Sequence, residues 1–153
     1  MSGIAYRGGY RYQNAADYSC ATGWQLPFAV SNRYARLDCK GILTIREGYA
    51  WDGPSGGMVD TKSAMRPSLE HDCLYQFLRE GLLPQHWRDK ADQRFRDEYL
   101  KDAMIGNARR NKVFAAIALP VIKARAWGAY HALRLGGGPS ADPANDRPIL
   151  SAP

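Results

Sequence analysis

Three segments decide how this chain folds: Gly-Tyr-Ala-Trp-Asp-Gly-Pro-Ser-Gly-Gly (48–57), Arg-Pro-Ser-Leu-Glu-His-Asp-Cys-Leu-Tyr (66–75) and Lys-Ala-Asp-Gln-Arg-Phe (90–95). The first holds four glycines and a proline in ten residues, and it therefore predicts an irregular loop. The second predicts a helix that begins near Pro67, because proline fits the first turn of a helix, and that ends at Gly81.

A second helix is expected over about 85–104, ended by Gly106-Asn107. Its apolar residues recur at helical spacing and comprise Trp87, Ala91, Phe95, Tyr99 and Met104. Only Leu82-Leu83-Pro84 separates it from the first helix. A connector this short makes the two helices antiparallel neighbours.

The flanking regions predict an α+β fold. Aromatic residues, turn residues and the strand core Ile42-Leu-Thr-Ile45 indicate a small N-terminal antiparallel sheet packed on the helices. A third helix is expected to be kinked or split at Pro120. One domain is expected over residues 1–135, followed by a flexible tail over 136–153. The domain comprises a β-rich region (1–47), the loop with its helix pair (48–104) and the third helix (108–134).

Composition restricts the class of protein. The chain has 153 residues and a net charge of +6, which fits one globular domain attracted to lipid headgroups, nucleic acid or an acidic protein surface. No specific nucleic-acid pattern is present. The N-terminus lacks an apolar signal core and no uninterrupted apolar run approaches membrane-spanning length. Three widely spaced cysteines predict free thiols, as in a protein kept in a reducing compartment.

His71, Asp72 and Tyr75 are the first candidates for chemistry. Consecutive residues leave a helix about 100° apart, so His71 and Asp72 can face one cavity from different sides. Tyr75 lies one turn beyond His71 on the same face. A histidine base needs a carboxylate on its second nitrogen, and Asp92 on the partner helix is the leading candidate. We predict a hydrogen bond between His71 and Asp92.

The glycine-rich loop predicts a site for a hard cation. Calcium binds many oxygens, often backbone carbonyls of irregular segments, and Asp72 would add a formal charge. The loop ligands expected are Trp51, Asp52, Gly53 and Gly56, and free loop N–H groups could also bind an oxyanion. Zinc or a His-Asp phosphohydrolase site is excluded because His71 is the first of only three histidines.

These motifs resemble phospholipase A2 of the small secreted bacterial and fungal types. The matches are Trp51-Asp52-Gly53, His71-Asp72-Cys73-Leu74-Tyr75 and Asp92-Gln-Arg-Phe95. The resemblance implies that His71 activates water, that Asp92 orients His71 with the help of Tyr75, and that Asp72 and the loop carbonyls bind Ca²⁺. An sn-2 ester of a membrane phospholipid would be the substrate.

The chain also departs from that family. Pro54 stands where a loop cysteine would be, and Cys73 has no evident partner. The fused loop and Ser-Leu-x-His-Asp signature also resembles uncharacterised phage and prophage proteins, which implies a location in the host cytoplasm or the virion. The alternative function is therefore a non-catalytic virion or tail component that contacts other virion proteins through a degenerate phospholipase-like scaffold.

Overall fold

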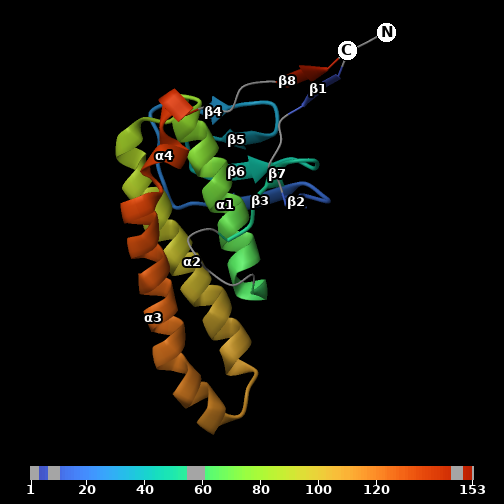
Figure 1. Cartoon of the computed structure of the whole chain (residues 1–153). Coiled ribbons are helices and arrows are strands. Elements are labelled where there is room, and N and C mark those ends of the chain that lie inside the picture. The colour runs from blue at the N-terminus through green and yellow to red at the C-terminus, as the bar shows by residue number, and fades with distance from the viewer. Residues whose placement is uncertain (1–3, 7–10, 55–60, 146–149, 153) are drawn as a thin grey trace.

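The computed structural model describes residues 4–6, 11–54, 61–145 and 150–152, and Figure 1 shows their arrangement. It confirms the α+β fold. The strands are β1 (Ile4–Tyr6), β2 (Tyr12–Gln13), β3 (Tyr18–Ala21), β4 (Val30–Ser31), β5 (Ala35–Leu37), β6 (Ile42–Ile45), β7 (Ala50–Trp51) and β8 (Leu150–Ala152). The helices are α1 (Lys62–Arg79), η1 (Gln85–Trp87), α2 (Arg88–Ala108), α3 (Lys112–Gly136), α4 (Gly138–Ala141) and η2 (Pro143–Asn145).

The sheets are antiparallel and small. Four strands pair in the order β3-β6-β5-β4, while β2 pairs with β7 and β1 pairs with β8. In β5 and β6 the residues alternate between a buried and a more exposed face, as the two-residue period of a strand requires. The inward residues Leu37, Leu43 and Ile45 are fully buried and share one core with Phe77 and Leu78 of α1.

Three long helices run up, down and up beside this sheet (Figure 1). Helix α1 packs on the sheet, α2 packs on α1, and α3 packs on α2. The predicted antiparallel pairing of the first two helices is therefore confirmed. Gly81 follows α1 with a φ of +69°, a conformation that glycine adopts without strain. The predicted stop at this residue is also correct.

The helix boundaries differ from those expected. Helix α1 begins at Lys62 rather than near Pro67, because its first turn packs: Ala64 is buried against Tyr99, Ala103 and Ala126. Thr61 is the N-cap residue but its side chain makes no capping bond.

Helix α2 extends further at its C-terminal end than predicted, and helix α3 is more continuous than predicted. Helix α2 continues through Gly106 to Ala108, and the buried Asn107 side chain donates to the carbonyl of Ala115 at the start of α3. Helix α3 runs through Pro120 as one helix, so the expected split is absent. It is started by Asn111, whose side chain accepts from the Val113 N–H, a standard N-cap interaction.

The prediction of a flexible tail from residue 136 is wrong for residues 138–145. Helix α4 packs against α1, and Ala141 at its end is fully buried in the main core. The Gln85 side chain donates to the Ala141 carbonyl, and Arg79 donates to that of Ser140. A segment of small residues shows no hydrophobic periodicity, which is why the sequence pattern did not reveal this packing.

Candidate active site

His71 of α1 and Asp92 of α2 face each other across the two antiparallel helices. The His71 Nε2 atom lies 2.9 Å from Asp92 Oδ1, and the Tyr75 hydroxyl donates to the same oxygen at 2.6 Å. Only 4% of His71 and none of Asp92 is exposed. The predicted hydrogen bond between His71 and Asp92 is therefore confirmed, and Tyr75 contacts Asp92 in the way that the resemblance implies.

Helix α3 supplies a fourth member of the site that the sequence pattern does not predict. Arg134 Nη1 donates to Asp92 Oδ2 at 2.9 Å, so both carboxylate oxygens have partners. Arg88 connects the same elements, since its Nε donates to the Tyr75 hydroxyl at 3.2 Å and its Nη2 donates to the carbonyls of Leu133 and Arg134. A carboxylate that is buried needs hydrogen-bond donors for both of its oxygens. If Asp92 is buried, this requirement indicates that a donor besides His71 must reach it.

The charges of this cluster follow from its bonds. Burial raises the pKa of Asp92, but hydrogen bonds from His71, Tyr75 and Arg134 outweigh burial and leave the pKa below its ordinary value. Burial and the neighbouring Asp92 carboxylate raise the pKa of Tyr75, which remains a neutral donor. Because ionised Asp92 can only accept, Nε2 of His71 carries a proton, and the unprotonated nitrogen of neutral His71 is Nδ1.

The Nδ1 side of His71 faces Asp72, whose Oδ1 lies 3.7 Å away. Burial lowers the pKa of His71, but Asp72 and Asp92 outweigh this effect and raise it above the ordinary value. The Asp72 side chain is 22% exposed. His71 therefore lies between a fully buried carboxylate that orients it and a second carboxylate that solvent can reach.

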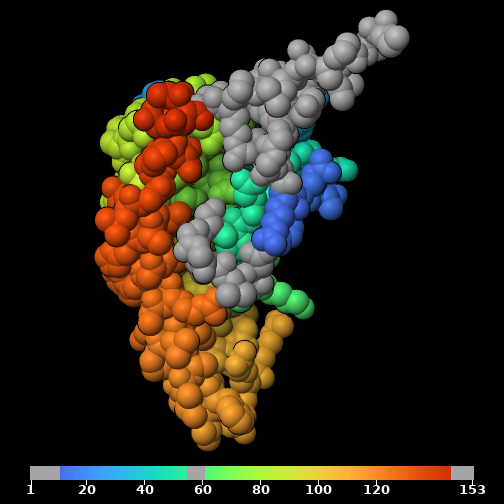
Figure 2. Space-filling view, viewed as in Figure 1, coloured from blue at the N-terminus to red at the C-terminus, as the bar shows by residue number. Residues whose placement is uncertain are grey.

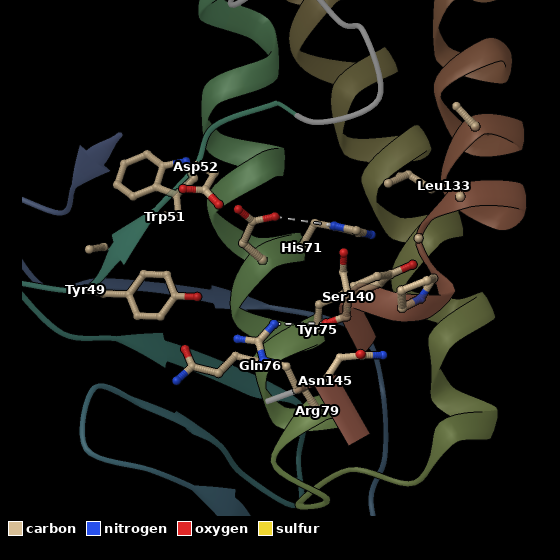
Figure 3. A pocket seen from close by; sticks show the side chains of 16 residues that line it. Tyr49, Trp51, Asp52, His71, Tyr75, Gln76, Arg79, Leu133, Ser140 and Asn145 are labelled. Carbon is tan, nitrogen blue, oxygen red and sulfur yellow. Dashed lines mark hydrogen bonds and ion pairs between the residues drawn. The ribbon is translucent and has the colours of Figure 1, made fainter. Parts of the chain in front are cut away.

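A cavity of about 540 Å³ adjoins this histidine, as Figure 3 shows. Its wall comes from four parts of the chain: β7 with the residue on either side of it, the middle and end of α1, the C-terminal end of α3, and the α4–η2 segment. Trp51, Asp52, His71, Asp72 and Tyr75 all line it. The volume falls within the range of small-molecule sites in proteins.

The loop entering the cavity is held in a defined conformation. The Trp51 indole N–H donates to the Ser68 hydroxyl of α1 at 3.2 Å, and its ring packs on Tyr12. Gly53 has a φ of +82°, and a Cβ atom added there would lie 2.6 Å from the Tyr12 ring. Glycine is therefore required at this position. The predicted ligand Gly56 lies outside the described residues.

The cavity wall contains oxygen donors of the kind that a hard cation prefers. Asp52 and Asp72, which both line it, offer carboxylate oxygens, and Trp51 and Asp52 bring backbone to the same wall. Carboxylate and backbone oxygens are the ligands of calcium. Within the described residues no group of three or more His, Cys, Asp or Glu side chains is placed to hold a metal. Backbone carbonyls would therefore have to complete such a site.

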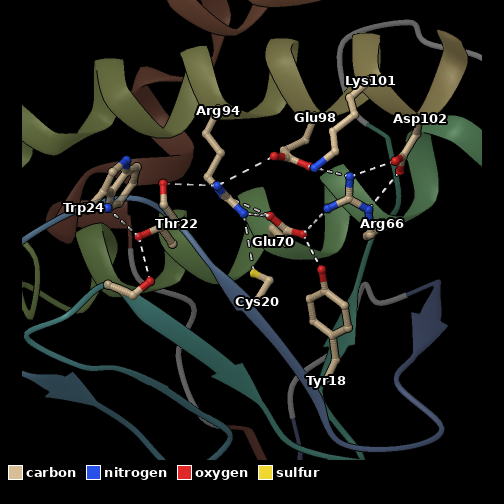
Figure 4. Close-up of polar contacts among 11 residues, drawn as sticks. Tyr18, Cys20, Thr22, Trp24, Arg66, Glu70, Arg94, Glu98, Lys101 and Asp102 are labelled. Carbon is tan, nitrogen blue, oxygen red and sulfur yellow. Dashed lines mark hydrogen bonds and ion pairs between the residues drawn. The ribbon is translucent and has the colours of Figure 1, made fainter. Parts of the chain in front are cut away.

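A second polar cluster lies on an adjacent face of α1, centred on Glu70 (Figure 4). Glu70 is 1% exposed and accepts from Arg66 at 2.7 Å, from Arg94 of α2 at 2.7 and 3.0 Å, and from the Tyr18 hydroxyl of β3. These bonds occupy the carboxylate fully. The cluster therefore joins the sheet, α1 and α2 next to His71 and offers no unpaired group for chemistry.

Comparison of the chain with protein-family models, with curated proteins and with solved structures gave no match.

Proposed function

We propose that this protein is a calcium-dependent, phospholipase A2-like esterase with His71 as its general base. The observation that supports this proposal is the His71–Asp92–Tyr75 arrangement beside a cavity, with Nδ1 on the side away from Asp92. The resemblance of the three motifs to phospholipase A2 supplies the substrate class, a phospholipid with an sn-2 ester.

The residues would act in a defined order. Asp92 holds the Nε2–H bond, so Nδ1 takes a proton from a water molecule as the water oxygen attacks the ester carbonyl. When the carbon–oxygen bond to the lysophospholipid breaks, His71 returns that proton to the leaving alkoxide. The products are a fatty acid and a lysophospholipid, and His71 ends neutral.

Asp72 and Asp52 would hold the cation, together with carbonyls of Trp51, Gly53 and Gly56. When bound, calcium supplies positive charge for the ester carbonyl oxygen as it becomes negative. Replacing Asp72 by Asn keeps the shape and one acceptor oxygen but removes the charge on which Ca²⁺ affinity depends. We expect a loss of rate of about 100-fold or more, as when one oxyanion donor is deleted.

The test is hydrolysis of phospholipid vesicles labelled in the sn-2 acyl chain, with calcium or with a chelator. We expect release of labelled fatty acid by the wild type with calcium only, none by His71→Gln, and release at least about 100-fold slower by Asp72→Asn. The matched control is Asp97→Asn, which changes an exposed aspartate of α2 and should leave the rate unchanged. Equal hydrolysis in chelator would refute the calcium mechanism, and an active His71→Gln variant would refute the base.

A second candidate is a non-catalytic virion or tail component of a phage, the origin that the loop signature suggests. The observation that favours it is the apolar outer face of α3, where Val113, Phe114 and Ile117 are each about two thirds exposed. A surface of this kind often marks a protein interface. Concentration-dependent assembly of the purified protein, with no calcium binding at millimolar concentration, would support this candidate over the esterase.

A further inference from the structure

The exposed apolar side chains are concentrated on one part of the molecule. We call residues 101–136, the end of α2 with the turn and α3, the α2–α3 hairpin; its lower part extends beyond the sheet in Figure 2. Of the ten large hydrophobic residues that are exposed in the described part of the chain, eight lie here. They are Met104, Ile105, Val113, Phe114, Ile117, Val121, Trp127 and Leu135, with exposed fractions from 44% to 89%.

The net charge of the protein resides in the same hairpin. It contains seven of the 21 lysines and arginines and one of the 15 aspartates and glutamates, so the rest of the chain balances at 14 of each. The single acid, Asp102, is bonded to Arg66 of α1 at 2.8 and 2.9 Å. The hairpin therefore combines most of the exposed large hydrophobic side chains of the described residues with the whole net charge of +6.

Helix α3 has two apolar faces. One packs on the protein through Ala126, Ala129 and Leu133. The other carries Val113, Ile117 and Val121 at four-residue spacing, which places them in one stripe along the helix. All three are more than half exposed.

Two cations flank this outer stripe. Lys123 and Arg125 are two residues apart, so they project about 200° from each other, on opposite sides of the stripe. Both are exposed. An apolar stripe with cations along its borders is the pattern of a helix that lies in the headgroup region of a membrane.

We propose that the α2–α3 hairpin docks on an anionic phospholipid surface, with the outer stripe of α3 among the upper acyl chains and its cations at the headgroups. The positive charge of the hairpin favours an anionic lipid surface over the other possible partners. Two copies of this protein meeting through the same surface would bring two charges of +6 together, which opposes association. Nucleic acid would use the cations but leave the aliphatic stripe exposed to water.

The same features favour lying on the membrane over crossing it. Helix α3 is long and apolar enough to span a bilayer by length and composition alone. However, Lys123 and Arg125 lie in its middle, where burial in hydrocarbon is costly. Its inner face is also already packed against α2. Peripheral docking keeps both the cations solvated and that packing intact.

The docking surface connects to the candidate active site without depending on it. Ala132, Leu133 and Gly136 at the C-terminal end of α3 line the cavity beside His71. A helix lying along the lipid surface would therefore hold this cavity close to the headgroups. Asp92 lies 16 residues from the end of α2, about 24 Å along the helix, so end-on insertion of the hairpin tip would hold the site far from lipid.

The experiment is co-sedimentation with vesicles of phosphatidylcholine alone or with 30% phosphatidylglycerol, in chelator, so that lipid is not consumed. We expect binding to the anionic vesicles that weakens with added salt. Lys123→Gln with Arg125→Gln should weaken it about 30-fold, from about fivefold per cation near an anionic surface. Ile117→Ser with Val121→Ser should weaken it more than tenfold.

The matched control is Phe28→Ser, which removes an apolar side chain of 49% exposure outside the hairpin and should leave binding unchanged. Circular dichroism and melting of each variant should match the wild type because the altered residues are exposed. Equal binding to both vesicle types, or to neither, overturns the proposal. So does a wild-type dimer by light scattering that Ile117→Ser converts to a monomer.

The two proposals fail separately. Vesicle binding without hydrolysis when calcium is present overturns the esterase and supports the docking surface. Hydrolysis of dispersed short-chain phospholipid without vesicle binding does the reverse.

Discussion

Replacing Arg134 by Met tests whether the third helix belongs to the candidate active site. The change removes the 2.9 Å bond to the fully buried Asp92 and leaves Oδ2 without that donor. A hydrogen bond to a charged group contributes about 1.5–3 kcal/mol, and loss of a partner from a fully buried pair costs about 3–5 kcal/mol. The Arg134 side chain is 34% exposed, so the lower range applies.

We expect Arg134→Met to lower the melting temperature by about 3–12 °C, since 1 kcal/mol corresponds to about 2–4 °C in a domain of this size. Urea unfolding at pH 7 gives the free energy directly. In an Asp92→Asn background the same substitution should cost much less, because the charge that Arg134 neutralises is already absent. The matched control is Lys123→Met, an exposed cation of the same helix.

Equal costs of Arg134→Met with and without the Asp92 charge would refute the reasoning, because the two side chains would then not interact. So would a melting temperature of Arg134→Met equal to that of the Lys123→Met control. In either case helix α3 would be a neighbour of the site and not a part of it.

Three further predictions concern acid, thiols and turns. Folding lowers the pKa of Asp92. The ionised carboxylate therefore stabilises the protein above its unfolded pKa of about 3.9, and this stabilisation is lost as the pH falls through the folded pKa. In urea titrations the difference in unfolding free energy between wild type and Asp92→Asn should shrink from pH 7 to pH 3. The three cysteines are free, so a thiol reagent should find about three groups in denatured, unreduced protein, and a count of one would indicate a disulfide. In the native protein Cys73 should not react, because it is buried and burial raises its pKa well above the ordinary value. Gly41→Ala should destabilise the protein more than Gly81→Ala in thermal melts, because both have positive φ but only at Gly41 would the Cβ meet the Trp24 carbonyl; equal costs would contradict this.

The sequence predicted those features that follow from local chemistry. A short connector determines that two helices are antiparallel, and a carboxylate near an apolar stripe must be paired if it is buried. Together they were sufficient to place Asp92 opposite His71, whereas the contact of Tyr75 with Asp92 was implied by the resemblance to phospholipase A2. Aromatic residues, turn residues and the strand core at 42–45 likewise predicted a small sheet before the loop.

The features that were missed depend on tertiary contacts. The first turn of α1 exists because Ala64 packs between α2 and α3, and a helix start near Pro67 was the better local solution. Helix α4 is held by the buried Ala141 side chain and by the Ala141 carbonyl, which accepts from the Gln85 side chain. A single small residue and a backbone carbonyl produce no recognisable sequence pattern. Arg134 was missed because nothing local indicates which helix lies next to Asp92.

The adjacency of Glu70 and His71 fixes the rotation of α1 about its own axis. Two consecutive buried side chains point in directions about 100° apart, one held by Arg94 and the Tyr18 hydroxyl and the other by Asp92. Turning the helix to improve one set of bonds would break the other. An isolated peptide of residues 62–108 would contain the whole His-Asp motif, yet without β3 and α3 it would lack Tyr18, which holds Glu70, and Arg134, which holds Asp92.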